Sequence, residues 1–386
     1  MISYGKQYID KKDIQSVTKS LKSDWITQGP KIKEFEDLLK KYFKSKFCIA
    51  VANGTAALHL TGLALGWKPG DIILTTPISF LATSNCIVYS GATPSFVDID
   101  ETNYNIDTKK LVEKIKLLKR RKKLIRAIIA TDYAGHPCDW KKLKSISKKY
   151  KIVLINDNCH SIGAKYNNDR GYAIKYADVV THSYHPVKHI TTGEGGAIFT
   201  NNANFAKKLR ILKSHGVTRN QKDMNRNHGP WYYEMHDLGY NYRITDFQCS
   251  LGISQIKKLN RFIKKRKKIA SIYDNEFSNT DIFTIPKVGK IVSHAYHIYP
   301  LLINFNKLKI KKDVFFKKMI KENIYLQVHY IPIHLQPYYK RNFKYKIGDF
   351  PIAEKFYKNE VSLPIYFSLK EREVRKVIKL VKKYCK

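Results

Sequence analysis

The chain has 386 residues, of which 71 are Lys or Arg and 32 are Asp or Glu, so its formal net charge is +39. This length allows one large or two modest domains, and the hydrophobic fraction of 43 % is ordinary for a globular protein. No run of about 18 apolar residues is present, which excludes a membrane-spanning helix. The basic residues lie in amphipathic Lys-rich segments, which favour solvated helix faces over a nucleic-acid-binding surface.

The N-terminus and the cysteines indicate a compartment. The first residues, MISYGKQYID, lack the apolar core of a secretory signal. The six cysteines are scattered and form no CxxC pair, so we expect free thiols and neither disulfides nor a metal site. These features predict a cytoplasmic protein.

Short apolar, β-branched runs alternate with helical patterns through the first two thirds of the chain. The predicted strands are residues 72–75, 94–99, 126–133, 152–156, 178–183 and 196–200. The predicted helices begin near Thr55, Ile78, Thr108, Asp139 and Asn204. This alternation predicts an α/β fold with a mostly parallel sheet covered by helices on both faces. Ligands of such sheets bind at the carboxyl ends of the strands.

The pattern changes near Ile253. Residues 253–277 are predicted to form one long helix that bridges two domains, followed by strand-like runs at 295–305 and 325–333 and a helix at 372–384. We therefore expect a large domain over 1–252 and a smaller α+β domain over 253–386. The N-terminal segment is expected to pack on the smaller domain.

Three stretches place polar residues where the predicted sheet would bind a ligand. Gly54 and Thr55 precede an Ala/Leu helix, whose free N–H groups would suit a phosphate, although Thr55 is also an ordinary helix cap. Asp157 follows a predicted strand, as a functional acid or as a turn residue. Lys188 follows Ser183 and precedes the turn TTGEGG, so it is either a Schiff-base nucleophile or a solvated loop lysine.

Two aromatic segments complete the set. Phe80 follows a predicted strand and is either a stacking ring or a core side chain. Asn241 and Arg243 lie in an aromatic loop, where they could bind phosphate, close an interface or cap a turn. Together these residues could supply a phosphate clamp, an acid for a ring nitrogen, a stacking ring and an amine nucleophile. Pyridoxal phosphate requires all four.

The chain also resembles a known family over essentially its whole length. The motifs WITQGP (25–30), NGTAALHL (53–60), TTPISF (75–80), DYAGHP (132–137) and DNCHSIGA (157–164) are similar to those of the DegT/DnrJ/EryC1/StrS sugar aminotransferases. SYHPVKHITTGEGGA (183–197), LGYNYRITDFQ (238–248), VHYIPIHLQPYY (328–339) and SLP (362–364) extend the likeness. The resemblance implies fold type I of the pyridoxal-phosphate-dependent transferases, with a mostly parallel sheet of seven strands.

The resemblance assigns roles to individual residues. Lys188 would form the Schiff base and act as general base, Asp157 would hold the ring-nitrogen proton, and His160 would lie near the ring. The implied cofactor-binding residues are Gly54, Thr55, Ala56, Phe80, Asp157, His160, Ser183, Lys188 and Asn241. The implied substrate-binding residues are Thr27, Tyr133, His185, His329 and Tyr330. Asn241 would come from the partner subunit, which implies a homodimer.

The variants TTPISF, SYHPVKHITT and VHYIPIHLQPYY resemble the branch that aminates C4 of a UDP-linked 4-keto-6-deoxy-N-acetylhexosamine in pseudaminic acid synthesis, with L-glutamate as donor. An aminotransferase for a dTDP-keto sugar or a GDP-perosamine precursor is the alternative. A DNA-binding regulator of the same fold is a further one, but the chain has no spare segment for a helix-turn-helix domain. His185 and His189 either tune Lys188, touch the substrate or pack the turn. The His329–Tyr330 pair either contacts the sugar or faces the inside of the small domain.

Overall fold

One seven-stranded sheet dominates the computed structural model, which describes residues 1–278 and 280–386. The strand order is β2 (Phe47–Val51), β9 (Gly196–Thr200), β8 (Val179–Ser183), β6 (Val153–Asp157), β5 (Leu124–Thr131), β3 (Asp71–Thr75) and β4 (Thr93–Phe96). Only β9 is antiparallel to its neighbours β2 and β8 within this sheet. The predicted α/β fold with a mostly parallel sheet is confirmed.

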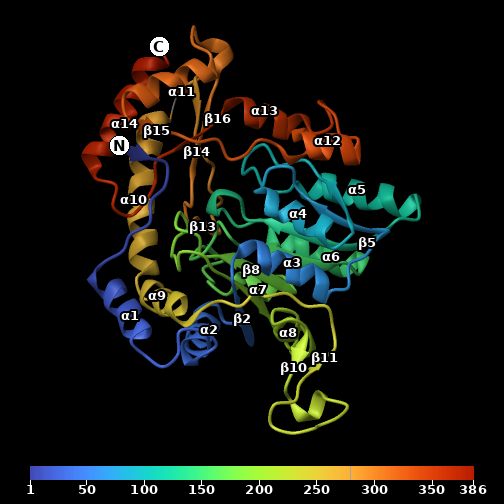
Figure 1. Ribbon diagram of the computed structural model, residues 1–386. Helices are drawn as coiled ribbons and strands as arrows, with labels where there is room; N and C mark the ends of the chain where they lie inside the picture. Colours follow the sequence, from blue (N-terminus) through green and yellow to red (C-terminus); the bar gives the residue numbers. More distant parts are fainter. Residues whose placement is uncertain (279) are drawn as a thin grey trace.

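Helices cover both faces of this sheet (Figure 1). One core contains side chains of α3 (Gly54–Ala64), α4 (Leu81–Tyr89) and α8 (Ala203–Leu212). The other contains side chains of α2 (Pro30–Phe43), α5 (Thr108–Arg120), α6 (Trp140–Tyr150), α7 (Tyr172–Tyr176) and α9 (Asp246–Ile256). Neighbouring residues of β6 divide between them, since Leu154 belongs to the second core and Ile155 to the first. Both faces are apolar, which explains the unbroken apolar strands.

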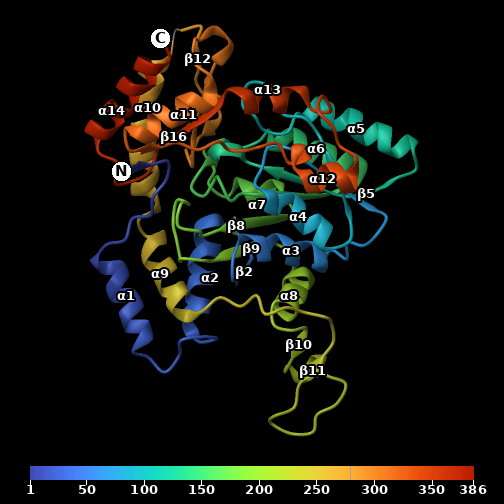
Figure 2. The ribbon, with the colours of Figure 1, turned by 45° about the horizontal axis from the view of Figure 1, so that its top comes forward.

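A separate core surrounds an antiparallel sheet of β12 (Phe283–Thr284), β14 (Tyr299–Ile303) and β16 (Glu360–Leu363). Three helices pack on it: α10 (Leu259–Phe277), α11 (Lys312–Lys321) and α14 (Glu371–Tyr384). Along α10, Phe262 and Ile263 belong to the second core of the seven-stranded sheet, whereas Ile269 and Tyr273 belong to this separate core. β1 (Ile2–Ser3) pairs with β15 (Ile324–Tyr325), so the chain's N-terminus lies beside these C-terminal elements (Figure 2).

Two predicted elements differ from the structure. The long helix at 253–277 is divided, because α9 ends at Ile256 and α10 begins at Leu259. At the break, the Lys258 ammonium lies 2.6 Å from Asp10 and 2.8 Å from Asp13, so a long-range ion pair holds the turn. The run 325–333 is not a strand. Beyond β15 it contributes a single bridge, from Gln327 to Ser362, and then a 3-10 turn at Ile333–Leu335.

The remaining elements surround these cores. They are α1 (Lys11–Leu21), the 3-10 turn Tyr133–Gly135, β7 (Lys165–Tyr166), β13 (Val292–Ser293), the 3-10 turn Phe305–Lys307, α12 (Pro337–Phe343) and α13 (Pro351–Asn359). β10 (Val217–Thr218) and β11 (Glu234–Met235), with the 3-10 turn Gln221–Asp223, form an arm over residues 217–235 that projects away from the body (Figures 1 and 2). Trp231 is 72 % exposed on this arm.

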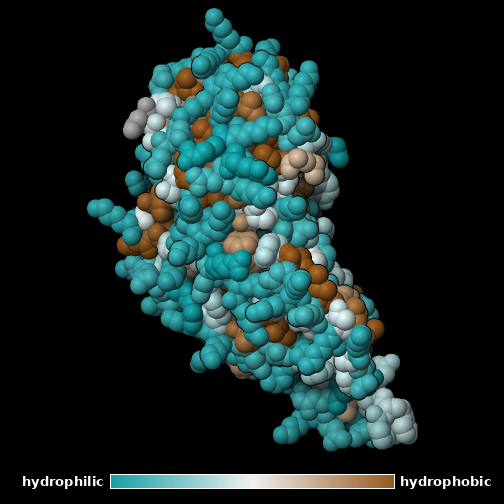
Figure 3. Space-filling model, turned by 90° about the vertical axis from the view of Figure 1, so that its left-hand side faces the viewer, coloured by the Kyte–Doolittle hydropathy of each residue, from teal (hydrophilic) through white to brown (hydrophobic). Residues whose placement is uncertain are grey.

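Basic side chains of the amphipathic helices lie at the surface, as α10 shows. Along α10, Arg261, Lys264 and Lys268 are exposed or half-buried while Phe262 and Ile269 are buried. The face that carries α1, α10 and α14 is mainly hydrophilic (Figure 3). All six cysteines are buried free thiols. None of the helices that the structure describes has the length and hydropathy needed to span a bilayer.

Candidate active site

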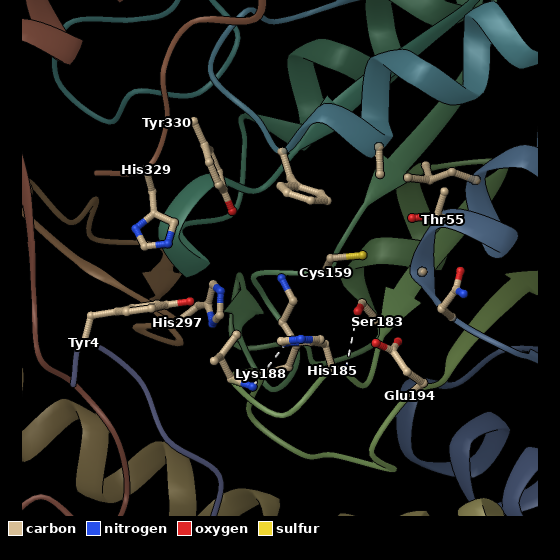
Figure 4. A pocket seen from close by; sticks show the side chains of 16 residues that line it. Tyr4, Thr55, Cys159, Ser183, His185, Lys188, Glu194, His297, His329 and Tyr330 are labelled. Atoms are coloured by element: carbon tan, nitrogen blue, oxygen red, sulfur yellow. Dashed lines mark hydrogen bonds between the residues drawn. The ribbon is translucent and has the colours of Figure 1, made fainter. Parts of the chain in front are cut away.

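A cavity of about 390 Å³ opens at the carboxyl ends of the central strands. Its walls come from both halves of the chain. The lining residues are Tyr4, Asn53, Gly54, Thr55, Leu58, Phe80, Ala82, Cys159, Ser183, His185, Val187, Lys188, Glu194, His297, His329 and Tyr330. In Figure 4, Lys188, His297 and Ser183 point to a common space. The sheet therefore brings together residues that lie far apart in the sequence.

One end of the cavity is the N-terminus of α3. The Asn53 side chain accepts a hydrogen bond from the backbone N–H of Ala56 at 2.8 Å, which caps the helix. The first N–H groups of a helix have no partner inside it, and the helix dipole favours an anion there. Thr55 and Ser183 add hydroxyl groups to the same end of the cavity. This end is thus suited to a phosphate group.

Lys188 lies in the turn that follows β8. Its backbone N–H donates to the carbonyl of His185 at 2.9 Å, which closes the turn and directs the side chain into the cavity. Burial lowers the pKa of Lys188 below its ordinary value, and the nearby Cys159 and Asp157 offset part of this effect. A lowered pKa increases the fraction of neutral amine, which is the nucleophilic form.

Asp157 ends β6 and is buried, and it does not line the cavity itself, although its neighbour Cys159 does. The Thr83 hydroxyl donates to its Oδ2 at 2.6 Å, and the backbone N–H of Cys159 donates to its Oδ1 at 3.3 Å. These two donors fix the plane of the carboxylate. A carboxylate held in this way can accept a further hydrogen bond from a ring N–H above it.

His160 is also buried and does not line the cavity, whereas its neighbours Tyr330 and His297 do. Its Nε2 lies 2.9 Å from the Tyr330 hydroxyl, and its ring lies 4.5 Å from that of His297. Burial lowers the pKa of His160 well below its ordinary value, with smaller contributions from Lys188, His329 and His189. His160 is therefore neutral. Its Nδ1 is buried without a hydrogen-bond partner among the described residues.

Six residues expected at the site do not line the cavity of this single chain: Asp157 and His160, described above, and Ala56, Tyr133, Thr27 and Asn241. Ala56 is buried and its N–H is engaged by Asn53, while Tyr133 is buried and donates through its hydroxyl to the backbone carbonyl of His329 at 2.5 Å. Thr27 and Asn241 are exposed, the former bridged to Thr245 and the latter to Ser214. The two histidines beside Lys188 also differ. His185 lines the cavity, whereas His189 is buried with Nε2 3.1 Å from the carbonyl of Ala295.

The cavity also contains residues that the sequence did not single out: Tyr4, Asn53, Leu58, Ala82, Cys159, Val187, Glu194 and His297. Asn53 and Cys159 lie inside motifs already noted, so their proximity to Gly54 and Asp157 was an available signal. Tyr4 and His297 are positioned by tertiary contacts, such as the pairing of β1 with β15. No local pattern marks them.

Comparison with known proteins places this site in a family. The model of the DegT/DnrJ/EryC1/StrS aminotransferase family matches residues 7–382. An uncharacterized protein of Methanocaldococcus jannaschii is 43 % identical over 97 % of this chain and 95 % of its own. The UDP-4-amino-4,6-dideoxy-N-acetyl-beta-L-altrosamine transaminase of Campylobacter jejuni is 37 % identical over 97 % of this chain and 95 % of its own.

A solved structure of the same family is also similar to this chain. PseC of Helicobacter pylori, an aminotransferase of pseudaminic acid biosynthesis, superposes with a TM-score of 0.89 at 30 % identity, covering 100 % of this chain and 99 % of that chain. This chain belongs to the DegT/DnrJ/EryC1/StrS aminotransferase family. It is a pyridoxal-phosphate-dependent sugar aminotransferase of fold type I.

The residues of the cavity fit this cofactor. Position 54 has room only for glycine, because a Cβ there would lie 2.7 Å from Cβ of Ser183. The absence of that carbon lets the backbone at the start of α3 come close to an anion. Lys188 supplies the amine, and Phe80, 55 % exposed at the cavity, supplies an aromatic face. Asp157 supplies a fixed carboxylate next to the cavity residue Cys159.

Proposed function

We propose that the enzyme transfers an amino group from L-glutamate to C4 of a UDP-linked 4-keto-6-deoxy-N-acetylhexosamine, namely UDP-2-acetamido-2,6-dideoxy-β-L-arabino-hex-4-ulose. The reaction would belong to pseudaminic acid biosynthesis in the cytoplasm. The observation that carries the proposal is the placement of Lys188 in the same cavity as the anion-binding end formed by Asn53, Gly54 and Ser183. The Campylobacter transaminase at 37 % identity supports the choice of sugar.

Lys188 and Asp157 have defined tasks in this reaction. Pyridoxal phosphate, when bound, supplies an aldehyde that condenses with amines and a ring that accepts electrons. Lys188 would hold the cofactor, then act as general base and move a proton to and from the carbon that carries the amino group. Asp157, oriented by Thr83, would keep a proton on the ring nitrogen.

The substrate end of the cavity lies on the opposite side, where His329 and Tyr330 face Tyr4 (Figure 4). We assign the sugar to this end. Glutamate would bind first and leave as 2-oxoglutarate, and the keto sugar would then receive the amino group at C4. Thr27, Tyr133 and His185 remain proposed substrate-binding residues, of which His185 lines the cavity.

The test is a panel of nucleotide keto sugars with L-glutamate as donor, analysed by mass spectrometry and by NMR of the product's C4 configuration. The expected product of the UDP-linked keto sugar gains the mass of an amino group in place of the keto oxygen. Turnover of a dTDP- or GDP-linked sugar, with none of the UDP-linked one, would replace the proposed substrate. A Lys188→Ala variant is the blank for both outcomes.

We also propose that two copies share their active sites. Asn241, expected at the cofactor phosphate, is exposed and absent from the cavity of its own chain. It follows the projecting arm, which carries exposed Trp231 and Met235, and nearby Leu238 is 77 % exposed. A second copy that covers these side chains would bring Asn241 to its partner's cavity.

Subunit mixing tests this sharing. Lys188→Ala and Asn241→Ala are each expected to be nearly inactive alone. Mixed dimers of the two contain one cavity with both native residues, so about half of the mixed dimers' cavities regain activity. If mixing restores nothing although light scattering shows dimers, Asn241 acts within its own chain or not at all.

We propose, finally, that the chain divides near residue 252 into a large domain (1–252) and a small domain (253–386), with the N-terminal segment on the small one. The separate core around β14 and the pairing of β1 with β15 support this division. Limited proteolysis should cut preferentially between the two domains. Cleavage confined to the arm would argue for a single cooperative unit.

A further inference from the structure

Strand β16 carries two polar residues in a fully buried position. Glu360 and Ser362 have 0 % exposure, and so do Val361 and Leu363 between and beside them. Alternate residues of a strand point to opposite faces, so Glu360 and Ser362 share one face while Val361 and Leu363 pack in the core. A buried carboxylate and hydroxyl need hydrogen-bond partners.

Glu360 and Ser362 form hydrogen bonds with each other and with His329. The Ser362 hydroxyl donates to Oε1 of Glu360 at 2.5 Å, and the backbone N–H of His329 donates to Oε2 at 2.9 Å. The same Ser362 oxygen lies 2.8 Å from Nδ1 of His329. The Ser362 N–H donates to the carbonyl of Gln327 at 2.8 Å, which holds the His329 segment beside β16.

Hydrogen counting then fixes the proton on His329. A serine hydroxyl has one hydrogen, and here Glu360 receives it. The Ser362 oxygen can therefore only accept from Nδ1, so Nδ1 carries the imidazole proton. Burial lowers the pKa of His329 to about 3, with a smaller contribution from Lys188, so the ring is neutral and Nε2 keeps a free lone pair.

The lone pair of Nε2 is on the side chain that lines the cavity. His329 lines it, and Figure 4 shows its ring between the rings of Tyr330 and Tyr4. Within residues 1–278 and 280–386, Nε2 of His329 makes no hydrogen bond to protein. An acceptor at this place is free to receive a hydrogen bond from an O–H or N–H donor of a ligand bound in the cavity.

We propose that Glu360 and Ser362 are positioning residues that hold His329 as its Nδ1–H tautomer, so that Nε2 selects a sugar with an O–H or amide N–H donor facing it. The identity of the ligand as a sugar rests on the proposed function. The tautomer itself does not. A site built around one acceptor rejects an analogue that lacks the matching donor.

The protonation state of Glu360 determines which nitrogen of His329 carries the proton, and the groups around Glu360 influence that state. Lys312 on α11 and the hydroxyls of Tyr104, Tyr133 and Tyr330 lie near it. The ring of His329 is linked to it through Ser362. Burial raises the pKa of Glu360 to about 7, while Ser362, Lys312 and the His329 N–H favour the carboxylate. When Glu360 takes up a proton from solvent, it donates to Ser362, and Ser362 donates to Nδ1. The His329 proton then moves to Nε2, which becomes a donor.

The first test observes the tautomer directly by nitrogen NMR of the holoenzyme labelled at histidine. The His329 signals are those lost in His329→Gln. At a pH about one unit above the Glu360 value, the expected pattern is a protonated Nδ1 and an unprotonated Nε2. A protonated Nε2 at that pH would overturn the proposal, whatever reaction the enzyme performs.

The second test separates the two half-reactions. Ser362→Ala removes the acceptor for Nδ1, so kcat/KM for the keto sugar should fall about 10- to 100-fold while conversion of the bound cofactor by glutamate changes less than about threefold. Ser362→Thr keeps the hydroxyl and should restore the sugar half-reaction. In the wild type, KM for the sugar should rise as pH falls through about 7, and Glu360→Gln should flatten that limb.

The outcomes distinguish this inference from the proposed function. An unchanged sugar half-reaction in Ser362→Ala, with an active wild type, refutes the positioning role and leaves the function standing. If the wild type accepts no keto sugar, the function fails and the NMR result alone decides the tautomer. If Ser362→Ala does not fold, the wild-type NMR spectrum and the sugar kinetics of Ser362→Thr still support or refute the positioning role.

Discussion

Gly54 lies so close to Ser183 that a methyl group at position 54 would stand 2.7 Å from Cβ of Ser183. Real Cβ atoms do not approach to this distance, so Gly54→Ala must displace either the start of α3 or the end of β8. Both form the anion-binding end of the cavity. We expect cofactor affinity, measured by absorbance titration, to fall about 10- to 100-fold, since displacements near 1 Å have effects of this size.

Gly289→Ala is the matched control for that variant. The nearest atom to a Cβ at position 289 is Cγ2 of Val292 at 3.9 Å, and the position lies outside the cavity. Its affinity should equal that of the wild type. If Gly54→Ala also binds the cofactor normally, this end of the cavity does not hold the phosphate.

Lys188→Ala removes the amine that the cavity presents to the cofactor. Loss of proton transfer alone should lower the rate about 10²- to 10⁴-fold. The visible absorbance that reports the covalent lysine–cofactor link should also disappear. Lys264→Ala, on the exposed side of α10, is the control and should retain full rate. Normal turnover of Lys188→Ala would remove this residue from the mechanism.

Asp157→Asn keeps the shape of the side chain but removes its charge. An amide cannot stabilise a protonated ring nitrogen as a carboxylate does, so we expect the rate to fall about 10²- to 10³-fold with the cofactor still bound. Asp178 immediately precedes the first residue of β8, at the opposite end of the strand from Ser183, and it does not line the cavity. Asp178→Asn should therefore leave the rate unchanged. Equal rates for wild type and Asp157→Asn would contradict the assigned role.

Features set by local sequence were predicted, and features set by distant contacts were not. The strands could be identified because both of their faces are buried, and Asp157 and Lys188 because they follow strands. The break between α9 and α10 depends on the ion pairs of Lys258 with Asp10 and Asp13, more than 240 residues away. The contact between His160 and Tyr330 joins residues 170 positions apart. Such pairings have no signature in a single sequence.

The histidines around Lys188 give a prediction for stability. Burial lowers the pKa values of His160, His189, His294 and His297 well below the ordinary 6.5, so the native protein keeps them neutral. Below pH 6.5 the unfolded chain binds protons that the native chain does not. The free energy of unfolding should therefore decrease as the pH falls, by up to about 1.4 kcal/mol per pH unit for each histidine.

His189→Gln removes one of these groups and tests the prediction. Urea unfolding at several pH values between about 5 and 6.5 should give a slope smaller by up to about 1.4 kcal/mol per pH unit than that of the wild type. The loss of packing lowers stability at every pH and so does not mimic a change of slope. His228→Gln, exposed on the arm, should keep the wild-type slope. Equal slopes for all three proteins would mean that His189 titrates alike in the native and unfolded chains.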